Sequence, residues 1–352
     1  MQDPRMTAFD ATATASPDTR FAVTHGGWRL SEEFDHRHAW LRVAHGDQQV
    51  CWQLEAHSGG WLARLREGHA APAMTTRDAG LETALRQWLQ ALFARDTGYR
   101  YLRVDDALRA LCPTVFGEPV VKRAEFYQQP PLWYRGDNLG RHEQVWTTSD
   151  SGVRHPRRRP LPTGTVYERY CADIDQVFSF RRASPEQDVE RLTDWMNQPR
   201  VARFWEKAVP RDEIAAYLDR VLGMAHLQPV VGCFDGQPVG YFEFYWAAED
   251  PVGAYYEADP YDRGVHMLIG DANYLGRRLG RAWTLSLSHF VFLDDPRTRR
   301  LIGEPRADNQ ALLKYVERTP GWTKIKEFDF PHKRAALIVC DRDDFFDRVV
   351  FP

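Results

Sequence analysis

The residues best suited to chemistry lie in one stretch, between residues 264 and 282. An apolar strand from Gly264 to Gly270 is followed by Leu275-Gly276-Arg277-Arg278-Leu279-Gly280-Arg281-Ala282 and a long apolar helix. A glycine-containing turn at a helix start leaves free backbone N–H groups pointing at one place, and the helix dipole adds positive potential there. The pattern favours a site for a phosphate or pyrophosphate group, with a simple tight turn as the alternative.

Two common phosphate-binding signatures are absent from the sequence. It contains neither the dinucleotide pattern G-x-G-x-x-G nor the P-loop pattern G-x-x-x-x-G-K-[ST]. Glycine at 276 and 280 allows close backbone approach, and the small Ala282 keeps the first helical turn open. The sequence therefore predicts phosphate binding of another form at this helix start.

One histidine lies in the middle of the strand that leads into the turn. His266 alternates with Val265 and Met267, so it shares a strand face with Gly264 and Leu268. A histidine titrates near neutral pH and can accept a proton during catalysis. A packed or surface histidine is the alternative for a single histidine on a strand.

Strands and helices alternate around these residues in the second half of the chain. We expect a mixed order of strands at 177–182, 229–234, 239–245, 264–269, 300–304, 325–330 and 335–340 and helices at 185–196, 211–222, 279–292 and 310–318. The first half predicts an antiparallel meander, with strands at 38–43, 50–55 and 61–65, and then a helix over 78–93. Between 127 and 162, proline-rich segments break both periodicities. These patterns predict an α/β chain with a mixed sheet and two domains.

Composition limits the partners that such a chain can have. The 352 residues carry a net charge of −3, which excludes a uniform positive field for nucleic acid or an anionic membrane. The five scattered cysteines are typical of reduced thiols in a cytoplasmic protein. His36 and His38 lie two apart without a third ligand in the pattern, so we expect no metal.

The second half resembles the GCN5-related N-acetyltransferases (GNAT). Residues 277–282 match the signature R/Q-x-x-G-x-G/A of that family, and the expected element order over 177–340 is similar to its fold. More narrowly, residues 155–340 resemble the siderophore acyltransferases of the aerobactin type, which act on N6-hydroxylysine, hydroxyornithine or hydroxylated diamines. The matching segments are 155–158, 166–169, 195–197, 204–206, 240–243, 261–266, 303–309 and 330–335.

The resemblance implies roles for individual residues. It implies His266 as the catalytic base and Asp308 as the acid beside it, with Glu304 as the alternative acid. It implies acyl-CoA binding by Leu268, Ile269, Gly276, Arg277, Arg278, Leu279, Gly280, Arg281, Ala282 and Asn309, of which Leu268 and Ile269 are candidates for the backbone N–H that binds the acyl oxygen. Acceptor recognition would use Arg203, Trp205, Tyr245, Trp246, His332 and Lys333. Asp308 could instead be the N-cap of the 310–318 helix, a role that Asn309 could also fill.

The implied reaction is N-acylation of a hydroxylamine. An acyl group passes from acetyl-CoA or succinyl-CoA, as co-substrate and without a metal, to the nitrogen of an N-hydroxylated amino acid or diamine, giving an iron-chelating hydroxamate. The partners would be these two small molecules, and a homodimer stays open. Alternatives are a GNAT enzyme for an ordinary amine, such as an aminoglycoside, and a non-catalytic acyl-CoA-binding scaffold.

The expected domain organisation follows from these patterns and the resemblance. It comprises a disordered N-terminus at 1–20, a β-rich domain at 21–150 that could be a degenerate GNAT copy, a proline- and arginine-rich connector at 151–170, and a catalytic GNAT domain at 171–352. The arginines at 157–159 of the connector would be either solvated or within reach of a phosphate.

Overall fold

The computed structural model describes residues 19–34, 39–66, 78–95, 98–136, 144–149, 152–159 and 162–351. The chain divides into two compact units, unit 1 from the N-terminus to Tyr127 with the last three residues, and unit 2 from Gln128 to Val349. Residues 1–18 of the expected disordered segment, and His36 and His38, lie outside the described residues. Among the described residues, no helix combines the length and the apolar character needed to cross a membrane.

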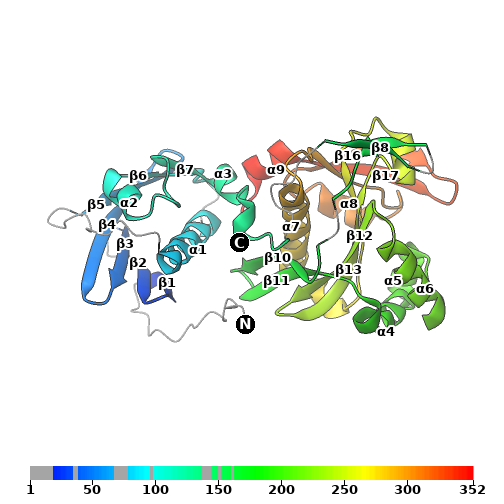
Figure 1. Cartoon of the computed structure of the whole chain (residues 1–352), viewed down its shortest axis with the longest axis horizontal. Helices are drawn as coiled ribbons and strands as arrows, with labels where there is room; N and C mark the ends of the chain where they lie inside the picture. Colours follow the sequence, from blue (N-terminus) through cyan, green and yellow to red (C-terminus); the bar gives the residue numbers. More distant parts are fainter. Residues whose placement is uncertain are drawn as a thin grey trace. The chain divides into compact units, whose positions relative to one another are not determined.

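Unit 1 holds, in its described residues, a seven-stranded sheet in the order β1 to β7. All neighbouring strands are antiparallel except β5 and β6, which are parallel and are joined through helix α1. Helix α1 packs on β1 and β2 (Figure 1). The elements are β1 (Thr19–His25), β2 (Trp28–Phe34), β3 (Ala39–His45), β4 (Gln48–His57), β5 (Gly60–Leu65), α1 (Ala79–Arg95), β6 (Tyr101–Val104), α2 (Asp106–Leu111), β7 (Val120–Lys122) and α3 (Arg123–Tyr127).

The core of unit 1 confirms the expected meander and helix. Strand β3 alternates buried and partly exposed residues, as a half-buried strand requires. On α1, the apolar positions that recur at helical spacing are buried, and Trp88 and Leu89 are both completely inaccessible.

Unit 2 holds, in its described residues, an eight-stranded sheet in the order β10-β11-β12-β13-β14-β15-β17-β16. Its strands are β10 (Thr165–Cys171), β11 (Gln176–Arg182), β12 (Leu227–Phe234), β13 (Gln237–Trp246), β14 (Arg263–Ile269), β15 (Arg300–Gly303), β16 (Trp322–Asp329) and β17 (Arg334–Asp341). Its helices are α4 (Pro185–Met196), α5 (Pro199–Trp205), α6 (Arg211–Leu222), α7 (Arg277–Asp294), α8 (Gln310–Val316) and α9 (Arg342–Arg348). A separate two-stranded hairpin joins β8 (Trp146–Thr148) and β9 (Arg154–Pro156).

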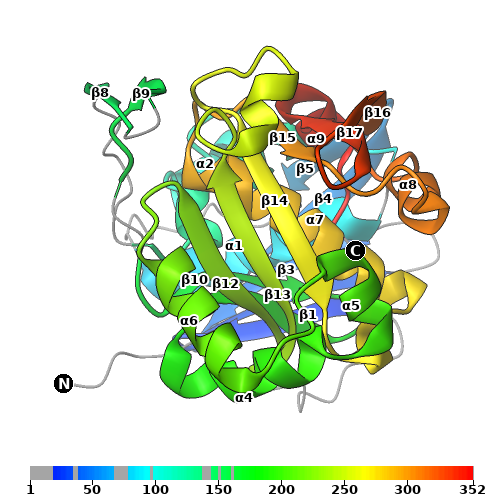
Figure 2. The same cartoon turned by 90° about the vertical axis from the view of Figure 1, so that its right-hand side faces the viewer.

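Helices cover both faces of the unit 2 sheet. Figure 2 shows α4, α5 and α6 in front of the sheet, with α7 behind it. The even-numbered side chains of β13, such as Phe242 and Phe244, pack with Phe290 and Trp283 of α7. The odd-numbered ones, such as Tyr241 and Tyr245, belong to the core cluster beneath α4 and α6. The two faces of β13 and β14 therefore serve different layers.

The structure places the domain boundary earlier than we expected. Strand β10 begins at Thr165, within the expected connector 151–170, and pairs with β11 along the edge of the catalytic sheet. Within this connector, Arg158 is neither solvated nor directed at a phosphate. Its side chain is 2% exposed and forms an ion pair with Glu249. The proline-rich composition indicated a linker, but long-range pairing makes the segment part of unit 2.

Candidate active site

Strands β14 and β15 part in the middle of the unit 2 sheet. Their parallel pairing covers only Arg263↔Leu301 and Gly264↔Ile302, while β14 pairs with β13 over its whole length. Beyond Gly264, one backbone edge of β14 therefore faces a split that β15 does not fill. The pairing of β14 with β13 has no register shift, so the split arises because β15 diverges from β14.

The N–H groups of alternate residues along β14 point to opposite sides of the strand, so only every second one faces the split. Gly270 donates its N–H to Val239 of β13, so the even-numbered N–H groups of β14 point toward β13. The N–H groups of Met267 and Ile269 then point the other way. The N–H of Ile269, one of the two expected donors, therefore faces the split, whereas that of Leu268 points toward β13. The N–H of Met267, which the sequence analysis did not select, also faces the split.

The helix start after β14 has open donors, as the sequence predicts. Gly276 is the N-cap residue of α7, and in the described part of the chain no side chain caps this helix start. A Cβ atom added at Gly276 would meet nothing within 4 Å, so the space in front of the helix is open. Arg278 and Arg281 are exposed beside it, while the side chain of Arg277 lies outside the described residues. This start suits an anionic group such as a pyrophosphate.

Helix α8 packs against the first turns of α7. Gly280 is buried below the hydroxyl of Tyr315, which bonds Thr284 at 3.1 Å, and Ala282 is buried. Asn309 is the N-cap of α8, accepting from the N–H of Leu312 at 3.3 Å. The cap is therefore Asn309 and not Asp308. The side-chain oxygen of Asn309 thus caps the helix.

His266 lies at the split and is held by two carboxylates. Its Nε2 lies 2.7 Å from Oε1 of Glu304, the first residue after β15, and its Nδ1 lies 3.3 Å from Oε2 of Glu243 on β13. The His266 side chain is 32% exposed, whereas both carboxylates are almost fully buried. His266 and Glu304 thus connect the two strands where their backbones separate.

Electrostatics favour the charged form of this histidine. Burial of the ring opposes the charge, but Glu304 and Glu243 outweigh burial and raise the pKa of His266 well above its usual value. Burial likewise acts to raise the pKa of Glu304, but His266 and, more weakly, Lys333 hold it below its usual value. Because the imidazole is already protonated in this structure, a further proton is shared by the whole group of His266 and its two carboxylates.

Asp308 does not hold the place beside His266. Its exposed carboxylate lies 3.2 Å from Nε of Arg306. The hydrogen bond from that guanidinium lowers the pKa of Asp308. The acid that contacts His266 from the segment after β15 is Glu304, the alternative left open by the sequence. Because β15 ends at Gly303, Glu304 lies at the edge of the split and Asp308 lies four residues further along.

The aromatic residues expected to bind the acceptor divide into two groups. The ring of Trp205 lies 6.5 Å from the ring of His266, at a position suited to a wall of the acceptor site. Tyr245 is completely buried, its tilted ring lies 4.6 Å from the ring of His266, and its hydroxyl donates to Glu304 at 2.6 Å, so it supports the His266–Glu304 pair. Burial raises the pKa of Tyr245, so its hydroxyl stays protonated as a donor.

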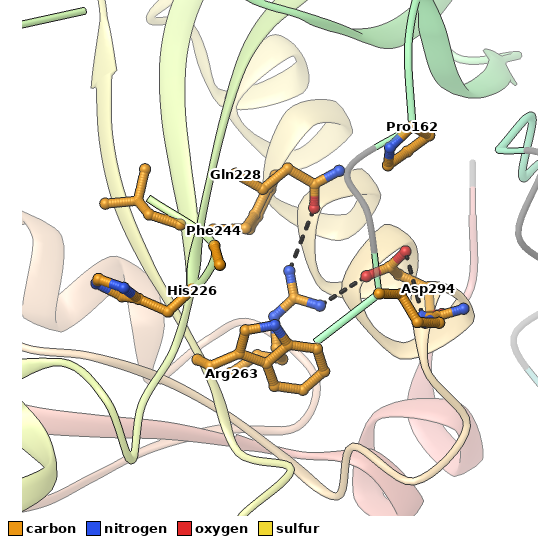
Figure 3. Close-up of a pocket in the computed structure, with 10 residues that line it drawn as sticks. Pro162, His226, Gln228, Phe244, Arg263 and Asp294 are labelled. Carbon is orange, nitrogen blue, oxygen red and sulfur yellow. Dashed lines mark hydrogen bonds and ion pairs between the residues drawn. The ribbon is translucent and has the colours of Figure 1, made fainter. Parts of the chain in front are cut away.

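Trp246 is not an acceptor wall. It is 7% exposed, and its ring lies 4.1 Å from the guanidinium of Arg158 and 4.2 Å from that of Arg263. Figure 3 shows Arg263 reaching Asp294 and Gln228, and these three residues line a small pocket of about 20 Å³. Arg263, on the α7 face of β14, thus belongs to a buried ionic cluster and not to the face that carries His266.

The remaining acceptor candidates lie on exposed segments. Lys333 is close enough to Glu304 to lower the pKa of that carboxyl, and within the described residues no carboxylate forms an ion pair with Lys333. Arg203 is exposed on α5, with its guanidinium 5.2 Å from the ring of Phe204. His332 is exposed and stacks on Phe330.

Comparisons with known proteins agree with this geometry. The acetyltransferase (GNAT) domain family matches residues 184–330. An N(6)-hydroxylysine O-acetyltransferase of Escherichia coli is 42% identical over 240 residues, covering 67% of this chain and 75% of the relative. This chain is a GNAT acyltransferase of that group.

Other relatives align over a smaller part of their length. A hydroxyornithine transacylase of Ajellomyces capsulatus is 38% identical over 203 residues, covering 56% of this GNAT acyltransferase but 46% of the relative. A crystal structure of an uncharacterized Bacillus halodurans protein matches with a TM-score of 0.50 and 29% identity, covering 53% of this chain and 94% of that chain. The GNAT acyltransferase thus carries its family fold in unit 2, as the sequence predicts.

All five cysteines of the GNAT acyltransferase are unpaired and buried. Burial raises the pKa of each thiol, for example that of Cys233 on β12. Such thiols are poor nucleophiles, which fits direct transfer rather than a covalent acyl-enzyme. Among the described residues, no group of three or more histidine, cysteine or acidic side chains is arranged to hold a metal ion.

Proposed function

We propose that this GNAT acyltransferase transfers an acyl group from acyl-CoA to the hydroxylamine nitrogen of an N-hydroxylated amino acid or diamine. The observation that carries the proposal is the His266–Glu304 pair, which lies at the split next to an uncapped helix start. The named activities of the relatives, on hydroxylysine and hydroxyornithine, support the choice of acceptor. The product is a hydroxamate, whose two oxygens chelate ferric iron as in siderophores.

The acyl donor would lie along β14 and the start of α7. The N–H groups at the start of α7, with Arg278 and Arg281 beside them, would bind the pyrophosphate of CoA. The N–H groups of Met267 or Ile269, which face the split, would donate to the thioester oxygen as it becomes negative. Acetyl-CoA and succinyl-CoA are the two donors that we consider.

The chemical step is a direct attack within a ternary complex. The hydroxylamine nitrogen forms a bond to the thioester carbon, the carbon–sulfur bond breaks, and sulfur leaves with the electron pair as the CoA thiolate. The proton released from nitrogen passes to the His266–Glu304 pair. A hydroxylamine is a weaker base than an amine and is largely unprotonated at neutral pH, so positioning contributes more than strong base catalysis.

The acceptor would bind on the face that carries His266. Trp205 lies near the imidazole and would form one wall, while Lys333 and Arg203 offer positive charge to a carboxylate. An amino acid acceptor would use this charge, and a diamine would not.

A matrix of donors and acceptors tests the proposal. Acetyl-CoA and succinyl-CoA are each combined with N6-hydroxylysine, N5-hydroxyornithine, N-hydroxyputrescine and N-hydroxycadaverine, and with the parent amines. Hydroxamate is read by its ferric colour and CoA by thiol release. We expect turnover with at least one hydroxylamine and little with its parent amine. Equal or faster turnover of the parent amines would overturn the proposed acceptor class.

A further inference from the structure

The second nitrogen of His266 has a partner that the proposed reaction does not yet use. Glu243 lies directly opposite His266 in the antiparallel register of β13 and β14, and its Oε2 lies 3.3 Å from Nδ1 of His266. Both ring nitrogens therefore face carboxylates, Nδ1 toward Glu243 and Nε2 toward Glu304. A carboxylate only accepts hydrogen bonds, so this arrangement is satisfied when both nitrogens carry a hydrogen.

Glu243 is itself fixed by two tyrosines. Its Oε1 accepts the hydroxyl of Tyr241, from the same strand, at 2.9 Å and also that of Tyr217, from helix α6. Glu243 is 3% exposed, and its other oxygen is left for His266. A buried carboxylate is expensive unless it is hydrogen-bonded or paired, and here both oxygens are used. The network therefore directs one oxygen of Glu243 at Nδ1.

Other titratable groups also lie around His266. The hydroxyl of Tyr245 bonds Glu304. The partly buried Asp250 and the hairpin residue Lys333 act at longer range, Asp250 on His266 and Lys333 on Glu304. Glu304 and Glu243 are the two that contact the imidazole. Glu304 comes from the far side of the split, whereas Glu243 comes from the strand that pairs continuously with β14. Glu243 is thus held on the strand next to His266, and Glu304 is the partner that contacts it from across the split.

We propose that Glu243 is a positioning residue that holds His266 through Nδ1, so that Nε2 stays directed at Glu304 across the split. The inference rests on the proposed function, because it assigns a part in the same transfer. When the nitrogen–carbon bond forms and the carbon–sulfur bond breaks, the proton leaving nitrogen enters the group formed by His266 and its two carboxylates. That group carries one net negative charge before the step and none after it.

The first test follows His266 in the free enzyme and needs no substrate. The imidazole is titrated by NMR of its ring carbon–hydrogen signals in the full-length wild type and in Glu243→Gln. Removing one negative charge should lower the pKa of His266, because the imidazolium loses a neighbour that stabilises it. An unchanged titration in Glu243→Gln would overturn the inference.

A matched control is available in the same domain. Glu249 is buried to a similar degree, and its Oε2 lies 3.3 Å from Nδ1 of another histidine, His155. Glu249→Gln should leave the titration of His266 at its wild-type position. An equal displacement in this variant would mean that loss of any buried carboxylate perturbs the site, which also overturns the inference.

The second test uses turnover with the best hydroxylamine from the acceptor matrix. In Glu243→Gln, we expect kcat to fall ~10-fold or more, the KM for acyl-CoA to stay near the wild-type value, and the acidic limb of the pH–rate profile to move to lower pH. Glu243→Asp keeps the charge, so it should retain the wild-type acidic limb and recover part of kcat. A fall in kcat that is equal in both variants with no movement of the limb would indicate a merely structural role.

The two tests separate this inference from the proposed function. If the wild type makes no hydroxamate with any acceptor, the proposed function fails, while the NMR titration still decides whether Glu243 holds His266. If Glu243→Gln does not fold, Glu243→Asp is titrated instead. Loss of the wild-type titration in a folded Glu243→Asp variant would then contradict charge-based positioning.

Discussion

Unit 1 and unit 2 build their sheets by the same sequence of pairings as far as the sixth strand. In each, five strands pair antiparallel in chain order, a helix follows the fifth, and the sixth strand returns parallel to the fifth. In unit 1 the parallel pair is closed along all of β6, from Gly60↔Tyr101 to Ala63↔Val104. In unit 2 it covers two residue pairs and then opens.

The helix after the fifth strand also differs between the units. In unit 1, Oδ1 of Asp78 accepts the N–H groups of Gly80 at 2.8 Å and Leu81 at 3.0 Å, so the start of α1 is satisfied by its own side chain. In unit 2, Gly276 brings no such acceptor to α7. Strand β5 also contains no histidine. In its described residues, unit 1 therefore shares the strand order of unit 2 up to the sixth strand but has neither the split, nor the open helix start, nor a histidine on the fifth strand.

The comparison teaches that the strand order alone does not make the site. Three local features do so, namely a parallel pair that opens, a glycine at the helix start, and a histidine between two carboxylates. The helix start and the histidine with its carboxylates can each be tested by single substitutions.

Removing the proposed catalytic pair, His266 and Glu304, should have the largest effect. We expect His266→Ala and Glu304→Gln each to lower the kcat for hydroxamate formation ~10²- to 10⁴-fold, because proton removal loses its acceptor or the partner of that acceptor. Isothermal titration calorimetry should find acyl-CoA binding nearly unchanged. Asp308→Asn is the matched control and should stay within a few-fold of wild type, since Asp308 pairs with Arg306. A large loss in Asp308→Asn with none in Glu304→Gln would reverse the assignment.

Giving unit 2 the helix start of unit 1 should weaken acyl-CoA binding. In Gly276→Asp, the carboxylate should take the N–H groups at the start of α7 and repel a phosphate, as a like charge about 4 Å away costs roughly 1 to 4 kcal/mol. We expect the KM for acyl-CoA to rise on the order of tenfold or more with little change in kcat.

Two variants at the same position separate the causes. Gly276→Ala adds a Cβ into open space and should behave like wild type. Gly276→Asn caps the helix without a charge and should lie between Ala and Asp. If Gly276→Asp binds acyl-CoA as tightly as wild type, the open helix start is not the feature that distinguishes unit 2.

Lys333 tests the acceptor side of the split. In Lys333→Met, the KM for an N-hydroxylated amino acid should rise by about tenfold, because a charge-assisted bond to its carboxylate is lost. The KM for the matching diamine should change much less. Lys326→Met, on the neighbouring strand β16, removes an exposed lysine and is the control. An equal change for both acceptors would mean that Lys333 acts through Glu304 and not through a substrate carboxylate.

Much of the fold could be predicted because its signals are local. The turn Asp235-Gly236 fixes the β12–β13 hairpin, since both residues adopt a positive φ. Proline at the first turn fixes the start of α4, and the glycine pattern fixes that of α7. The position of His266 on a strand before the open helix start followed from the same local reasoning.

The errors concern features that are set at long range. Asp308 was expected in the place of Glu304 because the sequence does not show where β15 leaves β14. Trp246 was expected to face the acceptor because nothing local shows that Arg158, from a distant segment, covers its ring.

Glu243 was missed although a signal was present. A charged residue in the middle of an apolar strand needs a buried partner, and counting forward from the Asp235-Gly236 turn places Glu243 within the strand that follows it. Glu243 belongs to the matching segment 240–243, but only the register between β13 and β14 shows that it lies opposite His266. That register depends on a connection of sixteen residues, 247–262, whose length gives no fixed alignment.

The smallest effect should follow from opening the helix start of unit 1. Asp78→Ala removes the acceptor for two N–H groups of α1 and should cost about 1 kcal/mol of local stability, while Asp78→Asn keeps an acceptor oxygen and should cost less. Hydrogen exchange of peptides from α1 in the full chain measures the change. The KM for acyl-CoA should not change in either variant. In unit 1, β5 and β6 stay paired along β6, so no split lies beside the start of α1 even when that start is open. A change in that KM would mean that unit 1 takes part in donor binding and that the closed sheet is not inert.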